Sequence, residues 1–116
     1  MRHQKKKIHL GRKQSHRRVL LKQLATSLFL YEKIETTVAK SKALRSYAER
    51  LITLAKKDTV SGRRAADKSL SHKNAVKKLF EVIGPKYKDR DGGYTRIRRT
   101  VRRAGDSAEK TIISLV

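Results

Sequence analysis

Residues 33–57, KIETTVAKSKALRSYAERLITLAKK, pass from a strand pattern to a helix pattern within a few positions. Ile34 and the threonines after it favour a short strand over about residues 33–36, because branched side chains suit extended backbone. Thr36 or Thr37 then caps a helix that we expect to run to about Lys57. Its apolar positions recur at helical spacing, at Leu44, Ala48, Leu51 and Leu54 or Ala55. A strand that leads directly into a long amphipathic helix favours the α+β class.

Further helical patterns lie on both sides of this stretch. Ser15 is a candidate N-cap for a helix over about residues 16–31. Its apolar face would comprise Leu20, Leu21, Leu24, Leu28 and Tyr31. Ser61 and Ser71 would start two more helical segments. The second would end at Gly84-Pro85 and bury Val76, Leu79, Phe80 and Ile83.

The sequence pattern of the C-terminal quarter predicts two strands. After turn residues 89–93, the chain alternates over residues 94–101, with Thr95, Ile97 and Val101 predicted on one face and Tyr94, Arg96, Arg98 and Thr100 on the other. A loop leads to a last strand over residues 111–116, which we expect to form a hairpin with the first. The predicted architecture is therefore α+β in two layers, with helices packed on a small mixed β-sheet.

Composition limits the possible functions. The chain has 116 residues, a formal net charge of +21 and 37% hydrophobic residues, which is enough for one small domain with a basic surface. It has no cysteine, which excludes disulfides and thiolate zinc sites. No run is long enough for a membrane span, and the first residues lack the apolar core of a secretory signal. An organellar transit peptide, which is also basic and poor in acids, is the rival interpretation of the N-terminus.

The first acidic residue of the chain is Glu32. Like charges repel, so the uncompensated cations before it suit a dense fixed anion, such as a nucleic-acid backbone. We expect residues 1–14 to form an extended basic arm and residues 15–116 to form a single α+β RNA-binding domain. The candidate RNA-binding residues of this region are Arg2, His3, Lys5, Lys6, Lys7, His9, Arg12, Lys13, His16, Arg17, Arg18 and Lys22.

The predicted hairpin carries the second group of candidate RNA-binding residues. They are Tyr94, Arg96, Arg98, Arg99, Arg102 and Arg103, in a segment that lacks interleaved acids. Tyr94 has two interpretations. It could stack on a base, which would contribute about 1–3 kcal/mol, or it could be a packing residue at the edge of the sheet.

Catalytic and metal sites are not expected. The four histidines lack the spacing of metal ligands, and Gly92-Gly93 neither follows a strand nor opens a helix, so it is not a phosphate-binding loop. Asp89 and Asp91 suit a turn better than acid–base chemistry. We therefore predict no enzyme activity, no cofactor and no small-molecule substrate. The absence of a recognition-helix motif favours RNA over DNA, although a DNA-compacting protein remains the alternative.

Distinctive short motifs occur along almost the whole chain. They include Met1-Arg2-His3, Gly11-Arg12-Lys13, Ser15-His16-Arg17, Ala25-Thr26-Ser27-Leu28-Phe29, Ile34-Glu35-Thr36-Thr37, Gly92-Gly93-Tyr94-Thr95-Arg96-Ile97 and Arg103-Ala104-Gly105-Asp106. Together these motifs resemble the family of bacterial-type large-subunit ribosomal protein seventeen. The chain departs from the family pattern at Glu109-Lys110, where a Pro-Met pair is usual.

The resemblance implies a structural component of the bacterial 50S subunit that is bound to 23S ribosomal RNA near the exit of the peptide tunnel. Neighbouring large-subunit ribosomal proteins would be its other partners. It also implies a compact α+β body with a basic N-terminal extension, no catalytic activity and no cofactor. Because the resemblance begins at Met1, we expect a bacterial cytoplasmic protein rather than one with a transit peptide.

Overall fold

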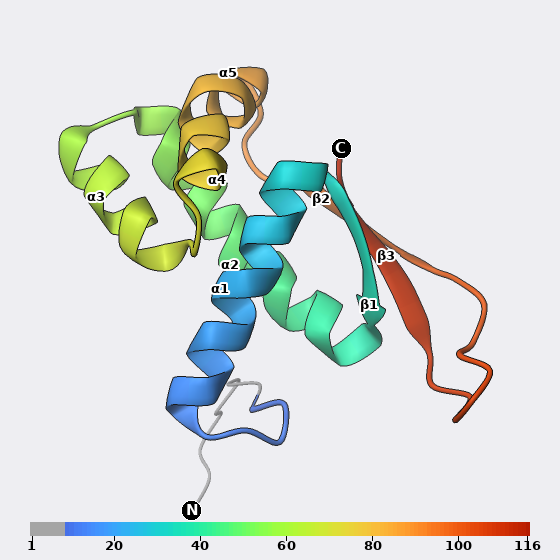
Figure 1. Cartoon of the computed structure of the whole chain (residues 1–116). Coiled ribbons are helices and arrows are strands. Elements are labelled where there is room, and N and C mark those ends of the chain that lie inside the picture. The colour runs from blue at the N-terminus through green and yellow to red at the C-terminus, as the bar shows by residue number, and fades with distance from the viewer. Residues whose placement is uncertain (1–8) are drawn as a thin grey trace, which may run out of the picture.

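The computed structural model describes residues 9–116 of the chain. Helices form most of this part, and three short strands form its one sheet (Figure 1). In chain order the elements are α1 (Gln14–Tyr31), β1 (Lys33–Thr37), α2 (Val38–Lys57), α3 (Val60–Ser69), α4 (Lys73–Lys78), the π-helical turn η1 (Leu79–Ile83), α5 (Gly84–Lys86), β2 (Thr95–Arg99) and β3 (Lys110–Leu115).

The sheet has the strand order β1-β3-β2, and both pairs are antiparallel. Ile113 of β3 pairs with Ile34 on one side and Ile97 on the other. The predicted hairpin between β2 and β3 is confirmed, whereas the expected mixed sheet is corrected to an antiparallel one. β1 and β2 run in the same direction, but β3 lies between them, so no parallel pair forms.

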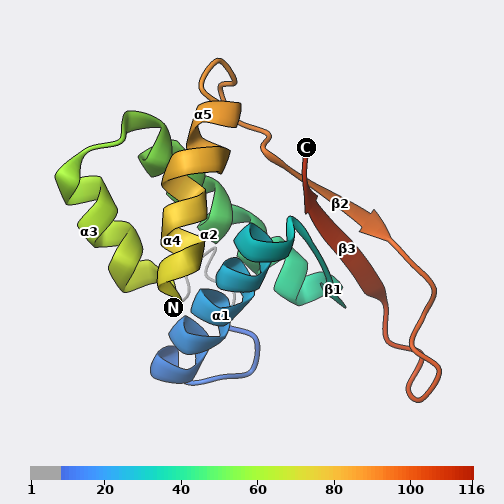
Figure 2. The ribbon, with the colours of Figure 1, turned by 45° about the horizontal axis from the view of Figure 1, so that its top comes forward.

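The helices cover one face of the sheet, which gives the two predicted layers (Figures 1 and 2). α2 lies against the strands, where Ser41 and Thr111 share a buried hydrogen bond and Glu49 accepts one from the Thr95 hydroxyl at 3.0 Å. The centre of the core consists of Leu28, Phe29, Leu44, Ala48, Ile52, Leu79, Ile83 and Ile113. The core therefore lies between α1, α2, η1 and the sheet.

The apolar face predicted for α1 is only partly correct. Leu28 is fully buried, but Tyr31 is 72% exposed, and Leu20, Leu21 and Leu24 are half-buried. The fully buried positions are instead Ala25, Leu28 and Phe29. The helix ends at Tyr31, and Glu32 adopts the left-handed conformation.

Three of the four predicted helix starts are wrong by one or two residues. Lys13, not Ser15, is the N-cap of α1, and its side chain makes no capping hydrogen bond. Thr59, not Ser61, caps α3 by accepting a hydrogen bond from the Gly62 amide at 3.0 Å. His72, not Ser71, caps α4, because its Nδ1 accepts from the Asn74 amide at 3.2 Å. Thr37 does occupy the N-cap position of α2.

Gly84-Pro85 does not end the helix that precedes it, contrary to the prediction. The chain widens to π-helical hydrogen bonding at η1 and then continues for one more turn through α5 (Figure 2). Pro85, which has no backbone N–H, lies in the first turn of α5, directly after the π-helical turn. Gly84 keeps right-handed helical angles rather than the left-handed ones of a glycine cap.

Residues 9–12 form a tight turn rather than an extended segment. Leu10 and Gly11 both have positive φ, and the Arg12 amide donates to the His9 carbonyl at 3.1 Å. α1 begins at Gln14, one residue inside the predicted arm. The extended shape predicted for the arm is therefore wrong for this part, and the prediction for residues 1–8 lies outside the described residues.

Candidate nucleic-acid interface

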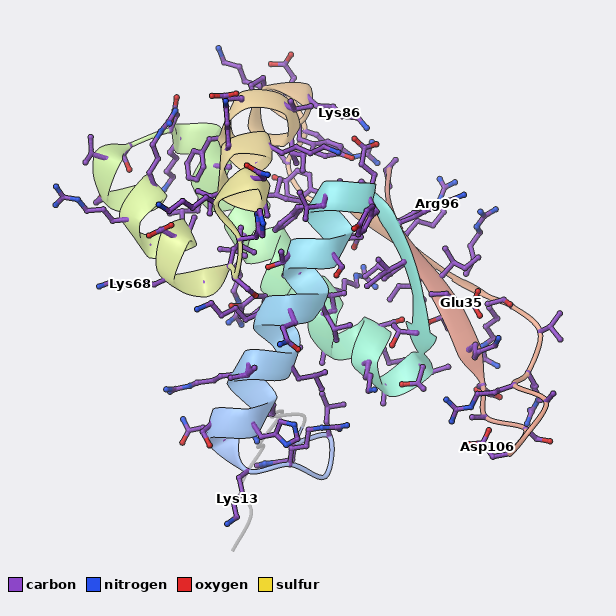
Figure 3. All side chains as sticks on the ribbon, viewed as in Figure 1. Lys13, Glu35, Lys68, Lys86, Arg96 and Asp106 are labelled. Atoms are coloured by element: carbon purple, nitrogen blue, oxygen red, sulfur yellow. The ribbon has the colours of Figure 1, made fainter. Side chains whose placement is uncertain are left out.

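Two cation groups on separate elements form the candidate interface: the outer face of the sheet and the first turns of α1. The register places Lys33, Ser114 and Arg96 side by side on the outer face of the sheet. Glu35, Ile112 and Arg98 form the next row. Both arginines are exposed, and Figure 3 shows Arg96 pointing away from the helices.

The strand alternation that exposes these arginines follows from burial on the other face. Thr95 is buried against Glu49 of α2, and Ile97 packs on the core, so Arg96 and Arg98 must point outward. Val101 was predicted to anchor the same inner face as Ile97, but it is 82% exposed. The strand ends at Arg99, before Val101 reaches the helices.

The hairpin arginines differ in whether an acid holds them. Arg99 and Arg102 share Glu109, at 3.6 Å and 3.1 Å from its Oε1. Arg103 pairs with Asp106 at 2.6 Å. Within residues 9–116, no acidic side chain pairs with Arg96 or Arg98. These two are therefore the hairpin cations with no internal counter-charge to give up when they meet a phosphate.

The loop of the hairpin, residues 100–109, extends beyond the body of the molecule (Figures 1 and 2). Its tip is ordered by Asp106, which accepts hydrogen bonds from the Arg103 guanidinium and from the Ala108 amide at 3.1 Å. These bonds to the charged form lower the pKa of Asp106 to about 2. Asp106 is thus a fixed anion at neutral pH, and it keeps Arg103 partly neutralised.

Glu109 and Lys110, where the sequence departs from the family pattern, both form ion pairs. Glu109 holds two arginines, and Lys110 lies 2.7 Å from Glu35 across the β1–β3 pair. Lys33, at the other end of β1, has no acid partner among the described residues. Sequence analysis missed Lys33 as a member of the outer face, although the alternation of residues 33–37 could have placed it there.

Tyr94 does not lie on the outer face, which corrects its prediction as a base-stacking residue. It is only 2% exposed, its ring centroid lies 5.2 Å from that of Tyr87, and its hydroxyl accepts a hydrogen bond from Lys56 at 3.0 Å. The bond from Lys56 lowers the pKa of Tyr94, against the effect of burial. Tyr94 is therefore a packing residue, as its second interpretation held.

The first turns of α1 present the second group of cations. Lys13, His16 and Arg18 are exposed, and Lys22 is half-buried. The first turn contains no acid, so the cations face the positive end of the helix dipole without compensation. Arg12 is held by the Leu10 carbonyl at 2.7 Å. Such a helix start is suited to an external anion.

Arg17, which was also predicted to bind RNA, is not exposed like the other cations of this group. It is 7% exposed, and its Nη1 donates to the Nδ1 of His9 at 3.0 Å. The pair joins the turn at residues 9–12 to α1, so both side chains serve the fold. Arg2, His3, Lys5, Lys6 and Lys7 of the predicted set lie outside the residues that the structure describes.

Other kinds of site find no support in the described part of the chain. No three of its histidines and carboxylates lie together as metal ligands would. None of the helices between residues 9 and 116 is long and apolar enough to span a membrane.

Comparison with known proteins gives consistent matches. Residues 20–116 match the family model described as ribosomal protein L17. A protein of Fusobacterium nucleatum named large ribosomal subunit protein bL17 is 50% identical over 116 residues, which cover all of both chains. A protein of the same name from Endomicrobium trichonymphae is 51% identical over 92% of each chain.

A third relative, also named large ribosomal subunit protein bL17, comes from Porphyromonas gingivalis. It is 52% identical over 116 residues, which cover all of this chain and 72% of the relative. The matches with the Fusobacterium and Porphyromonas proteins span the α1 cations, the helical layer and the hairpin together. The chain therefore belongs to the ribosomal protein L17 family of the bacterial large ribosomal subunit.

Proposed function

We propose that this protein is a structural constituent of the 50S subunit that binds 23S ribosomal RNA through its basic arm, the start of α1 and the hairpin. The observation that carries the proposal is the pair Arg96 and Arg98. Both are exposed on one face of a strand whose other face is anchored in the core, and neither has an acid partner within residues 9–116. The core therefore fixes the backbone positions of the two arginines, and they have no internal counter-charge to give up when they bind phosphates.

The proposed role of the protein is electrostatic. RNA segments that pack together repel through their phosphates, and fixed cations placed between them lower this repulsion. The arm contributes Arg2, Lys5, Lys6, Lys7, Arg12 and Lys13 by sequence, and α1 adds Arg18 and Lys22. The protein would in this way support folding of the RNA during subunit assembly. It would do so in the bacterial cytoplasm, where the ribosome is located.

The motifs shared with the family support a position near the exit of the peptide tunnel. The neighbours there would be 23S ribosomal RNA and other large-subunit ribosomal proteins. The proposal requires no substrate, metal or cofactor, because the cations of the interface act by charge and position alone.

Co-sedimentation with the large subunit through a moderate-salt gradient tests the proposal. We expect the wild-type protein to stay with the 50S particle, and loss of the protein at moderate salt would contradict the assignment. Competition between ribosomal RNA and duplex DNA at matched salt provides the second test. Preference for ribosomal RNA is expected, whereas equal affinity for both would favour a DNA-compacting protein.

A further inference from the structure

A groove of about 530 Å³ lies between the N-terminal half of α1 and the C-terminal end of α3. This volume falls in the range of roughly 300–1,000 Å³ that is usual for ligand pockets. The helices α1 and α3, whose residues line the groove, lie on one side of the molecule, and the hairpin lies on the other (Figure 1). The side chains that line it come from three successive helices, α1, α2 and α3.

The charge of the groove is entirely positive. Arg18 and Lys22 line it from α1, and Lys68 lines it from α3, with no acidic residue in the lining. None of these three cations pairs with an acid in the described part of the chain. Figure 3 shows Lys68 at the end of α3 that lies nearest to the first half of α1. Lys68 was not among the residues predicted from sequence.

The rest of the lining is largely apolar. Val19, which is 50% exposed, and Leu21 come from α1, and Tyr47 comes from α2. The Tyr47 hydroxyl donates to the Ser69 carbonyl at 2.7 Å. Burial raises the pKa of Tyr47, so the hydroxyl remains protonated and keeps this bond at neutral pH. The groove is thus lined by both apolar side chains and cations.

Hydrogen bonds fix the two sides of the groove relative to each other. The Ser71 amide donates to Thr26 Oγ1 of α1 at 2.9 Å, and the same hydroxyl donates to the Lys22 carbonyl at 2.8 Å. Together with the bond from Tyr47 to Ser69, they hold the end of α3 against α1 and α2. A ligand would therefore find the groove already formed, which reduces the cost of binding.

We infer that this groove holds one unpaired RNA nucleotide, with the base against Val19, Leu21 and Tyr47 and the adjacent phosphates at Arg18, Lys22 and Lys68. The inference rests on the proposed function, since it takes RNA as the ligand. An unpaired nucleotide fits because it offers an apolar base face beside its charges, whereas a duplex hides its bases in the stack. The protein would then hold RNA on two separate sides.

The test uses the full-length protein, a single-stranded RNA oligonucleotide and a duplex RNA of equal length. Lys68→Ala is compared with Lys73→Ala, which removes the same charge from another exposed position without an acid partner. We expect Lys68→Ala to lower the slope of log affinity against log salt for single-stranded RNA by about 0.7, the value for one phosphate. Lys73→Ala should leave the slope near that of the wild type.

A second measurement reports on the base. The Val19 methyl resonances should shift when single-stranded RNA is added and shift much less with the duplex. Equal slopes for Lys68→Ala and Lys73→Ala, or unchanged Val19 resonances, would overturn the inference. If Arg96→Ala/Arg98→Ala still weakens RNA binding in that case, only the groove is wrong. If the wild-type protein binds neither RNA but a polyglutamate peptide shifts Val19, both the groove assignment and the proposed function fail.

Discussion

The Lys56 ammonium donates a hydrogen bond to the Tyr94 hydroxyl at 3.0 Å and lies 5.3 Å from the centroid of the same ring. It also donates to the Arg90 carbonyl. This lysine at the end of α2 therefore holds the loop that leads into β2. A cation used in this way differs from Arg96, two residues beyond Tyr94, which has no acid partner within residues 9–116. Charge alone does not identify the interface, because internal partners decide which cations are free.

Replacing Lys56 by alanine should lower the free energy of unfolding by about 1 kcal/mol, because its hydrogen bonds are lost. Lys57→Ala is the matched control. Lys57 is exposed and has no partner in the described part of the chain. Lys57→Ala should therefore change the free energy of unfolding by no more than about 0.5 kcal/mol. Urea unfolding of both variants measures the difference. Equal stabilities would show that the Lys56 contacts contribute nothing.

Glu109→Gln should raise affinity for RNA. The substitution removes the acid shared by Arg99 and Arg102, and exposed ion pairs of this kind contribute about 0.2–1 kcal/mol each. For the two pairs together we expect an increase of about twofold to thirtyfold. Asp67→Asn, which removes an exposed acid without an ion pair in residues 9–116, is the control for net charge. An equal increase in RNA affinity for both variants would contradict the idea that Glu109 competes with RNA for Arg99 and Arg102.

Gly84→Ala should destabilise the fold, because an added Cβ would lie 3.0 Å from the carbonyl oxygen of Ala55 in α2. That contact is with backbone, so α2 and α5 would have to separate, at a cost of about 1–3 kcal/mol. Gly105→Ala is the control, since a Cβ there would meet nothing within 4 Å. Thermal unfolding of the two variants checks the prediction, and a Gly84→Ala protein as stable as the wild type would refute the close approach.

The contribution of Asp106 at the hairpin tip to stability should depend on pH in the acid range. The pKa of Asp106 is about 2 in the folded protein and 3.8 in its ordinary state, so the folded form binds fewer protons between these values. Its contribution to stability is complete above pH 3.8 and is lost as the pH falls through about 2. An NMR titration of the Asp106 carboxyl should give the low value, and Arg103→Gln should return it toward 3.8. A value near 3.8 in both proteins would show that the pair is not formed.

Much of the fold could be predicted from local patterns. The helix from Val38 to Lys57 and the β2–β3 hairpin carry strong periodicity, and the structure confirms both. The helix starts were less predictable, because Thr59 and His72 compete as caps with serines one or two residues away. Passage of the helix through Gly84-Pro85 depends on π-helical bonding, for which the sequence contains no separate signal.

The candidate site was harder to predict, because it depends on tertiary partners. Arg17 has the same local pattern as Arg18, yet it is buried against His9. The strand pattern puts Tyr94 on the same face as Arg96, but the Tyr94 side chain instead contacts Lys56 and Tyr87 and is buried. Lys68 joins Arg18 and Lys22 only because α3 ends beside α1. None of these contacts follows from the spacing of residues along the chain.

The most direct test of the account compares two pairs of hairpin arginines for binding to 23S ribosomal RNA. Arg96→Ala/Arg98→Ala removes the pair without acid partners, and Arg99→Ala/Arg102→Ala removes the pair that shares Glu109. Both substitutions remove two charges from one hairpin. We predict that the first lowers the slope of log affinity against log salt by about 1.4 to 1.8, and that the second lowers it by clearly less. An equal or larger loss for Arg99→Ala/Arg102→Ala would contradict the assignment of the outer sheet face as the RNA-binding surface.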